Sequence, residues 1–388
     1  MLSLSLLLAC PPVVDTGTGD TDTAAETGAT DTDTGTVDTD DTGDTSDTPP
    51  PIENTMGIVT TVADDYSGGV LATVNLETWA VTDSIITVPT DNGIVADKGN
   101  VYLLGRYGYD FVQVYKDGDL SAPADEFSVG DGANPQDVRE CGGKVYVTRY
   151  GKTDVSVYDP TTWLLSGVVD LAGHADSDGI PEMAELVEGP GVLYVALQQL
   201  DQNNGWVANG GVVAEIDCAT GALGSTWDVS PNPSITAWPG RPDLLVRTGV
   251  YYNADYSLAL DGGVSSLSVG SGALTPIVTE ATVGENIDAV AMVDGTHGVL
   301  LTSNESSQYT AWCFNPETGA TTKLFSTTSY INDMATGDGD NVWFAARQSW
   351  ADPESQGGII TVDAVACVAD SQVWHQNTTF APYAIAFR

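Results

Sequence analysis

The amino-acid sequence predicts an all-β fold, a seven-bladed β-propeller over residues 56–388, and three observations lead to this prediction. Short apolar runs that alternate with polar residues are separated by Gly, Asn, Asp and Pro, without helical periodicity. A strand pattern recurs about every 40–50 residues, the spacing of four-stranded propeller blades. The two ends of the domain each carry part of one such unit. Six or eight blades would also fit this spacing.

The repeated unit has a polar lead-in, a Gly-rich turn after the first strand, and a polar turn after the third strand. The clearest copy has its lead-in at 134–138, its second strand within 142–150 (GGKVYVTRY) and its third strand at 154–158. Similar third-strand turns recur at 75–78, 159–162, 217–221 and 315–319. Related lead-ins begin at Asn92, Asn134, Pro181, Asn232, Asn286, Asn332 and Pro382.

The two ends of the domain complete each other. The domain begins in the middle of a unit, with a second strand at 57–64, a third at 70–76 and a fourth at 81–88. It ends on residues 381–387, which match a first strand. One C-terminal and three N-terminal strands therefore make one blade, and closing the ring in this way removes exposed sheet edges.

The segment GGKVYVTRY, with its lead-in and its Asp-Pro-Thr-Thr turn, resembles the YVTN-repeat β-propellers, which are bacterial surface and periplasmic proteins. The likeness extends over most of residues 57–388 and is close at 134–171, whereas the units at 232–283 and 285–326 diverge from it. The resemblance implies a propeller at the cell envelope. It brings no catalytic residues, because the motif of that family is structural.

The N-terminus has the pattern of a bacterial lipoprotein. Residues 1–10 (MLSLSLLLAC) form an apolar run whose end resembles a lipobox, so we expect a signal segment that ends at a lipidated Cys10. Pro11, rather than Asp, follows this cysteine and implies anchoring in the outer membrane. The protein would then be periplasmic or surface-exposed, with the lipid as its contact with the membrane.

Residues 11–55 are rich in Asp, Thr and Gly and hold almost nothing apolar to bury, which predicts a disordered acidic tether. The whole chain of 388 residues carries a formal net charge of −42. Phosphate backbones and anionic lipid head groups would be repelled, so nucleic acid is not an expected partner. We expect a monomer on a flexible stalk.

Apart from Cys10, the chain has four cysteines, an even set that suggests disulfides in an exported protein. Cys141 follows a first strand, and Cys218 lies in the third-to-fourth-strand turn of the next unit. Cys313 and Cys367 are expected near such turns in two neighbouring units. The topology therefore predicts the pairs Cys141–Cys218 and Cys313–Cys367, with free thiols as the alternative.

Polar and aromatic residues gather where the second strands end, around the expected mouth of the central channel. Arginine grips carboxylates and aromatic faces stack on sugars, so a carboxylate, a glycan or a peptide would suit this mouth. Alternatively, the arginines tie neighbouring blades together through Asp91, Asp137, Glu182, Asp288 and Asp333, and both interpretations can hold. Five further residues lie close to the end of a second strand or in the loop after it: Tyr109, Arg247, Tyr251, Tyr252 and Asn304. The predicted ligand-binding residues are Arg106, Tyr107, Arg149, Tyr150, Gln198, Trp206, Arg347 and Trp350.

The longest loops interrupt the fourth unit. Asp176, Asp178 and Glu182 lie around a glycine turn and could hold calcium, which prefers six to eight oxygen ligands. A solvated turn without a metal is the alternative. A second insertion, 198–206, leaves on the same side, which makes the fourth blade the expected edge of the site.

The sequence favours a binding function over catalysis. The three histidines fall in different units, and no nucleophile elbow or phosphate-binding glycine loop occurs. The leading hypothesis is a lipoprotein that binds a small molecule, glycan or protein at the channel mouth, without a cofactor other than calcium. The alternative is a propeller lyase or hydrolase that acts on an exported small molecule or glycan. Glu182 and Asp333 could serve such an enzyme, with or without calcium.

Overall fold

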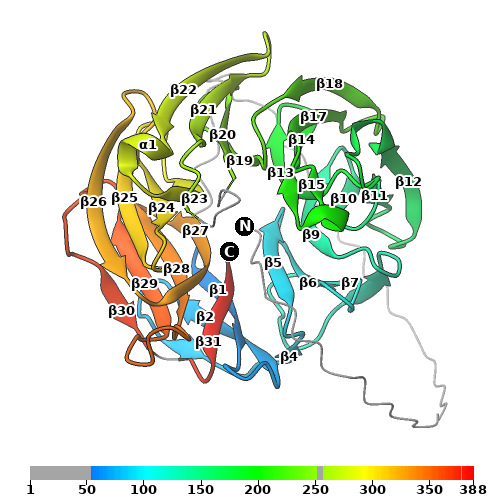
Figure 1. The fold of residues 1–388 in the computed structure, drawn as a ribbon. Helices are drawn as coiled ribbons and strands as arrows, with labels where there is room; N and C mark the ends of the chain where they lie inside the picture. The colour runs from blue at the N-terminus through cyan, green and yellow to red at the C-terminus, as the bar shows by residue number, and fades with distance from the viewer. Residues whose placement is uncertain (1–53, 251–256, 377) are drawn as a thin grey trace, which may run out of the picture. The chain divides into compact units, whose positions relative to one another are not determined.

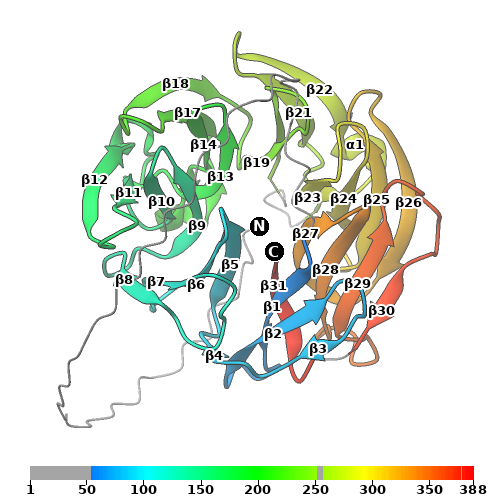
Figure 2. The ribbon, with the colours of Figure 1, turned by 180° about the vertical axis from the view of Figure 1, so that it is seen from behind.

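The computed structural model describes residues 54–250, 257–376 and 378–388, which form seven antiparallel sheets arranged in a ring (Figure 1 and Figure 2). Each sheet is one blade, and its first strand lies nearest the centre. The predicted all-β, seven-bladed propeller is confirmed. Cys10, the tether up to residue 53, Tyr251 and Tyr252 lie outside the described residues. No helix in the described ranges has the length and apolar character needed to cross a membrane.

Six blades consist of strands that follow one another along the chain. Blade 2 has β5 (Asn92–Asp97), β6 (Asn100–Gly105), β7 (Phe111–Tyr115) and β8 (Asp125–Ser128). Blade 3 has β9 (Pro135–Cys141), β10 (Lys144–Arg149), β11 (Asp154–Tyr158) and β12 (Leu165–Asp170). Blade 4 has β13 (Met183–Gly189), β14 (Val192–Leu197), β17 (Val212–Asp217) and β18 (Leu223–Asp228).

The remaining three of these blades include the two units whose sequences diverge from the repeat, and both units still form four strands. Blade 5 has β19 (Ser234–Ala237), β20 (Leu244–Thr248), β21 (Gly263–Ser268) and β22 (Ala273–Thr279). Blade 6 has β23 (Asn286–Met292), β24 (Gly298–Ser303), β25 (Tyr309–Asn315) and β26 (Ala320–Thr327). Blade 7 has β27 (Tyr330–Asp338), β28 (Asn341–Arg347), β29 (Gly358–Asp363) and β30 (Val373–His375).

The loops hold the other elements. Blade 4 carries an extra hairpin between β14 and β17, as the long insertion at 198–206 predicts. The hairpin strands are β15 (Leu200–Asp201) and β16 (Val207–Ala208), and the short helices are η1 (Ala172–His174), η2 (Gln202–Asn204) and α1 (Glu280–Val283).

Blade 1 closes the ring with strands from both ends of the chain. The C-terminal strand β31 (Ala381–Phe387) is its inner strand and pairs antiparallel with β1 (Met56–Val62), which in turn pairs with β2 (Gly69–Asn75). The backbone N–H groups of Thr55 and Met56 both donate to the carbonyl of Arg388 at 2.8 Å. The predicted closure between the two ends is therefore confirmed.

The outer edge of blade 1 differs from the prediction of one strand at 81–88. It consists of two short pieces, β3 (Val81–Thr82) and β4 (Thr87–Val88), which both pair with β2. Between them, Ser84 has a φ of 56°, and its N–H donates to the carboxylate of Asp83 at 2.6 Å. A left-handed residue cannot continue a strand, because its backbone turns away from the ladder.

The seam between blades 7 and 1 is sealed by aromatic side chains. Trp343 is fully buried, and its ring lies 4.7 Å from that of Trp79 and 4.9 Å from that of Phe387. A Cβ atom at Gly57 would come within 2.8 Å of the Trp343 ring. The close approach of β1 to this indole explains why glycine suits the start of the closing blade.

Two aspartates of inner strands join neighbouring blades at the same repeat position. Asp137 accepts the backbone N–H of Leu186 in the next blade at 2.8 Å, and Asp333 accepts that of Ile385 at 2.8 Å. Burial raises the pKa of both carboxyl groups. These aspartates are thus structural ties, which satisfy backbone donors that would otherwise be buried without a partner.

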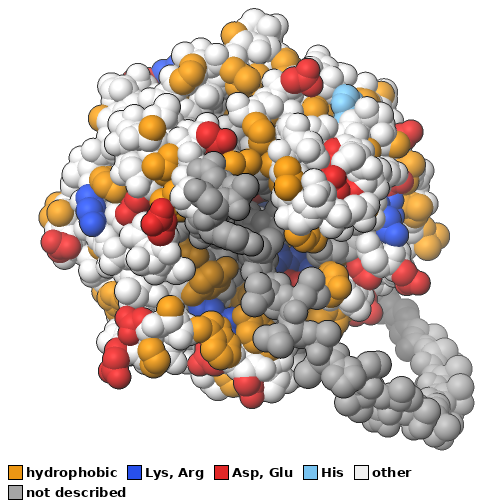
Figure 3. Space-filling model, viewed as in Figure 1, with side chains coloured by type: hydrophobic (Ala, Val, Ile, Leu, Met, Phe, Trp, Pro, Cys, Tyr) orange, Lys and Arg blue, Asp and Glu red, His pale blue; other side chains and the backbone are white. Residues whose placement is uncertain are grey.

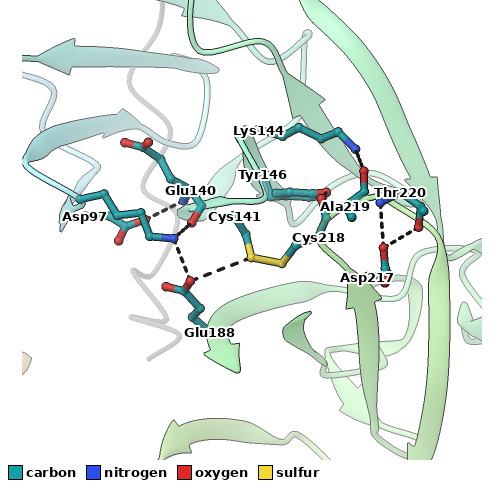
Figure 4. The surroundings of a disulfide bond; sticks show 11 residues. Asp97, Glu140, Cys141, Lys144, Tyr146, Glu188, Asp217, Cys218, Ala219 and Thr220 are labelled. Carbon is teal, nitrogen blue, oxygen red and sulfur yellow. Dashed lines mark hydrogen bonds and ion pairs between the residues drawn. A yellow bond between two sulfur atoms is a disulfide. The ribbon is translucent and has the colours of Figure 1, made fainter. Parts of the chain in front are cut away.

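Two disulfides connect neighbouring blades, and both predicted pairings are confirmed. Cys141 and Cys218 join blades 3 and 4 with a Cα–Cα distance of 5.3 Å (Figure 4). Beside this bond, the Tyr146 hydroxyl donates to the carbonyl of Cys218 at 3.0 Å. Cys313 and Cys367 join blades 6 and 7 at 5.9 Å, and Cys313 lies within β25 rather than in the following turn. Such bonds are typical of exported proteins.

Candidate functional site

The loops from second to third strands and the loops that lead into the next blade open on the same face of the ring, because neighbouring strands are antiparallel. We call this side the loop face. All predicted ligand-binding residues lie at the ends of second strands or in the loops that follow them, as does the insertion at 198–206, whereas the loop with Asp176 and Asp178 leads from β12 into β13. In Figure 3, acidic side chains are spread over the surface with few basic ones between them.

Arg106 contacts three blades at the channel mouth. Its Nε donates to Asp91 Oδ1 at 2.7 Å, within blade 2 and its lead-in. Its Nη1 donates to Gln136 Oε1 of blade 3, and its Nη2 donates to the Tyr383 hydroxyl of blade 1, both at 3.3 Å. The guanidinium is therefore engaged by the protein itself, as the interpretation of arginines as ties predicts.

Arg149, Tyr150 and Gln198 are also held within the fold. Arg149 forms an ion pair with Asp154, and its Nη1 donates to the Val129 carbonyl at 3.1 Å. The buried Tyr150 hydroxyl donates to the Gln198 side chain of blade 4 at 3.2 Å. Each of these three side chains therefore has a structural role. A role in ligand binding stays a prediction for them.

Arg347 joins blade 7 to blade 1. The residue is 3% exposed, and its guanidinium lies 4.6 Å from the centre of the Tyr66 ring. Its Nη1 donates to the Tyr66 hydroxyl at 2.6 Å. A cation stacked on an aromatic face stabilises such a contact by about 2 kcal/mol when it is desolvated. Arg347 thus fixes the turn between β1 and β2.

Three of the predicted aromatic residues are accessible on the loop face. The exposed fraction is 60% for Tyr107, 37% for Trp206 and 80% for Trp350. They belong to blades 2, 4 and 7, so the structure spreads them around the ring rather than bringing them together. These side chains offer flat apolar surfaces on which a sugar ring or a peptide could pack.

The predicted metal-binding residues converge in the loop between β12 and β13. Asp176, Asp178 and Glu182 each offer one oxygen, and these oxygens lie within 4.8 Å of one another. Oxygens that share one calcium ion at about 2.4 Å are at most about 5 Å apart, so the spacing fits that ion. Whether calcium binds here stays a prediction.

Glu182 is the buried member of this acidic cluster. Burial and the neighbouring charges of Asp178 and Asp176 raise its pKa to about 8. The backbone N–H of Leu200 and the amide of Gln202, both from the extra hairpin, donate to its carboxylate at 3.0 Å. Among the described residues, no Lys, Arg or His forms an ion pair with any of the three carboxylates. The cluster therefore lacks a cation from the protein.

Asp288 stands apart from the other inner-strand aspartates. It occupies the repeat position of Asp137 and Asp333, but its Oδ2 is buried without a hydrogen-bond partner. Burial raises its pKa to about 7, against the lowering effect of a hydrogen bond with Ser303 and the charge of Arg247. Arg247 is itself 3% exposed, with an unpartnered Nε.

A buried carboxyl with a free oxygen and a pKa near neutrality can take up and release a proton, as a general base must. The sequence named Asp333, with Glu182, as a candidate for catalysis and Asp288 only as a tie between blades. Asp333 accepts two backbone N–H groups and is less suited to catalysis than the sequence suggested. The missing partner of Asp288 had no local signal in the sequence, because that partner would come from the next blade.

Comparisons with known proteins concern the fold. No protein-family model matches the chain, and no curated protein sequence matches it. A protein from Bacteroides uniformis, provisionally named a 6-phosphogluconolactonase, superposes with a TM-score of 0.61 at 14% identity, covering 87% of this chain and 100% of its own. The periplasmic gluconolactonase of Pseudomonas aeruginosa superposes with a TM-score of 0.60 at 12% identity, covering 86% and 98%.

A dihydro-heme d1 dehydrogenase also superposes, with a TM-score of 0.53 at 15% identity, covering 85% of this chain and 66% of that one. These three proteins share the propeller fold with this chain. Proteins of different names thus have the same ring, and the activity of this chain has to be argued from its own loop face.

Proposed function

We propose that this protein is an exported propeller hydrolase that opens a small ester ring on its loop face with the help of a bound cation. The observation that carries this proposal is the acidic cluster of Asp176, Asp178 and Glu182, whose oxygens lie within 4.8 Å of one another. The cluster sits at the head of the inner strand β13. Among the described residues, no basic side chain forms an ion pair with these three carboxylates.

The three carboxylates would hold a calcium ion, and waters would fill its remaining positions. Asp176, Asp178 and Glu182 would hold the cation, whose chemistry there would be to polarise a carbonyl oxygen and so favour attack of water on the carbonyl carbon. The extra hairpin of blade 4 covers Glu182 and keeps bulk water from it. The attacking water would lose a proton and the ring oxygen would gain one as its bond to the carbonyl carbon breaks, so water is the only co-reactant and a hydroxy acid is the product.

The names of two similar structures support a sugar-derived lactone as the substrate class. The charge of this chain favours a neutral lactone over a phosphorylated one. The arginines at the channel mouth are engaged with Asp91, Asp154 and Tyr66, and the chain carries a net charge of −42. A phosphate group would find few free cations and a repulsive field.

The test is a pH-stat assay of the hydrolysis of glucono-δ-lactone and of its 6-phosphate, with calcium and after chelation. We expect turnover of the neutral lactone that chelation abolishes, and a loss of at least 100-fold in kcat/KM for Asp178→Asn. Asp228→Asn removes the same charge from the exposed outer strand of the same blade and should leave the rate unchanged. Turnover that survives chelation, or none above buffer, would refute the proposal. Saturable binding without turnover would instead support a ligand-binding protein.

We also propose that the export route is that of a lipoprotein of the YVTN-repeat type, with Cys10 lipidated and anchored in the outer membrane. The two inter-blade disulfides support export, because such bonds persist in oxidising compartments. The lipobox-like run before Cys10 supports the anchor. Metabolic labelling with a fatty acid should mark the protein in a bacterial host, and Cys10→Ser should abolish the label.

A further inference from the structure

A cavity of about 300 Å³ opens on the loop face between blades 7 and 1, away from the acidic cluster of blade 4. Three segments that are far apart in the sequence form its wall. The turn after β1 contributes Asp64, the loop after β28 contributes Gln348 and Ser355, and the segment before β31 contributes Gln376, Thr379 and Phe380. The cavity therefore exists only because the last blade closes against the first.

The wall offers neutral hydrogen-bonding groups and one carboxylate. The amide N–H₂ group of Gln348 donates to the carbonyl of Pro353, and that of Gln376 donates to the side chain of Gln356 at 3.1 Å. These bonds fix both amides. In the described part of the chain, neither amide oxygen accepts a hydrogen bond, so both remain available as acceptors. Asp64 adds a carboxylate whose side chain is 63% exposed.

Two aromatic side chains belong to the same loops. Tyr66 lies two residues after Asp64, and the guanidinium of Arg347 holds its ring from one side. Trp350 lies two residues after Gln348 and is 80% exposed. The loop that carries Trp350 is itself ordered, because the Ser355 hydroxyl accepts the N–H of Ser349 at 2.7 Å and donates to the carbonyl of Asp352 at 2.6 Å.

This combination is the chemistry of a neutral carbohydrate site. A sugar ring presents hydroxyl groups at its edge, which pair with amides and carboxylates, and apolar C–H faces, which pack on aromatic rings. An anionic ligand is disfavoured, because Asp64 lies in the wall and Arg347 is occupied by Tyr66 and Asp64. The volume lies at the lower end of the range for ligand sites, about 300–1,000 Å³, and suits one or two sugar rings.

We propose that the cavity between blades 7 and 1 is a carbohydrate-binding subsite for a neutral mono- or disaccharide unit. This proposal does not depend on the proposed lactone hydrolysis, which uses the acidic cluster of blade 4. Gln348 and Gln376 bind the hydroxyl groups of the sugar, Phe380 of the wall packs on its apolar face, and Trp350, on the same loop as Gln348, extends this apolar surface.

The experiment titrates the whole protein, in the presence of a chelator, with maltose, cellobiose, lactose and chitobiose. Binding is followed by tryptophan fluorescence and by saturation-transfer NMR of the sugar. We expect millimolar affinity for at least one disaccharide. Trp350→Ala and Gln348→Ala should each weaken it at least 10-fold, and Gln376→Ala should have a similar effect. Leu164→Ala removes an apolar side chain that is 69% exposed in a third-to-fourth-strand turn, on the opposite face, and should change nothing.

No saturable binding of any of the four sugars overturns the proposal. Binding that survives both Trp350→Ala and Gln348→Ala overturns it as well, because the sugar would then sit elsewhere. Because the titration is done in chelator, its result does not depend on the cation of blade 4. A protein that hydrolyses lactone and binds none of these sugars would thus separate the two proposals, and the reverse result would do the same.

Discussion

Replacing Glu182 with glutamine tests the acidic cluster through the stability of the protein. Glu182 has a pKa of about 8 in the folded protein and an ordinary value of 4.5. A raised pKa means that the folded state holds a proton that the unfolded state has lost. Between these two values the free energy of unfolding therefore falls as the pH rises, and below 4.5 the contribution is fully present.

The structure sets the size of this effect. Each pH unit between the two pKa values corresponds to about 1.36 kcal/mol, so the loss is at most about 5 kcal/mol. One kcal/mol corresponds to about 2 °C in melting temperature. Without calcium, raising the pH from 4.5 to about 8 should therefore lower the melting temperature by up to about 10 °C more than in a protein without this group. The amide introduced by Glu182→Gln keeps an oxygen to accept the N–H of Leu200 but cannot ionise.

Calcium should reverse this trend, because it binds the ionised cluster and competes with the proton. At a calcium concentration about 100 times the Kd, binding stabilises the folded protein by about 2.7 kcal/mol. We therefore expect calcium to raise the melting temperature of the natural protein at pH 9 by about 5 °C, with a smaller effect at pH 6. The Glu182→Gln variant should respond to neither pH nor calcium in this way.

The assay is differential scanning fluorimetry from pH 5 to 9, with calcium or with chelator. Asp228→Asn serves as the control, because it removes an exposed carboxylate of blade 4 and should behave like the natural protein. Other titrating groups, such as Asp288, contribute equally to both proteins, so the difference between the curves reports Glu182. Equal pH slopes for the natural protein and Glu182→Gln, or a calcium effect that survives the substitution, would refute the reasoning.

Three further predictions concern the remaining parts of the molecule. Asp288→Asn should flatten the fall in the free energy of unfolding between pH 3.8 and about 7, since burial raises the pKa of Asp288 to about 7 and the amide cannot ionise; an unchanged pH dependence of thermal unfolding would contradict this. Replacing Cys141 and Cys218 with Ser opens a link between residues 77 apart and should cost about 4 kcal/mol, seen as a lower guanidinium midpoint in the absence of reductant. Trp343→Ala should cost about 3–5 kcal/mol by emptying the seam between blades 7 and 1, whereas Trp350→Ala, at an exposed position, should leave thermal unfolding within about 0.5 kcal/mol.

Much of the fold could be predicted from the sequence, because the signals for strands and turns are local. The alternation of β11 and β31, and the turn residues between strands, marked both strands with the bounds that they have in the structure. The repeat period indicated the number of blades, and the incomplete units at the two ends predicted the pairing of β31 with β1. The disulfide pairs followed from the same topology, because equivalent turns of neighbouring blades lie close together.

The tertiary structure decided how the polar side chains are used. Arg347 and Tyr66 are separated by 281 residues, and only the closed ring brings them into contact. The same closure creates the cavity between blades 7 and 1. Asp137, Asp288 and Asp333 share one position in the repeat, yet only the placement of the next blade decides which of them is satisfied. Patterns along a chain report the strand to which a residue belongs, whereas its partners depend on packing between strands that are distant in sequence.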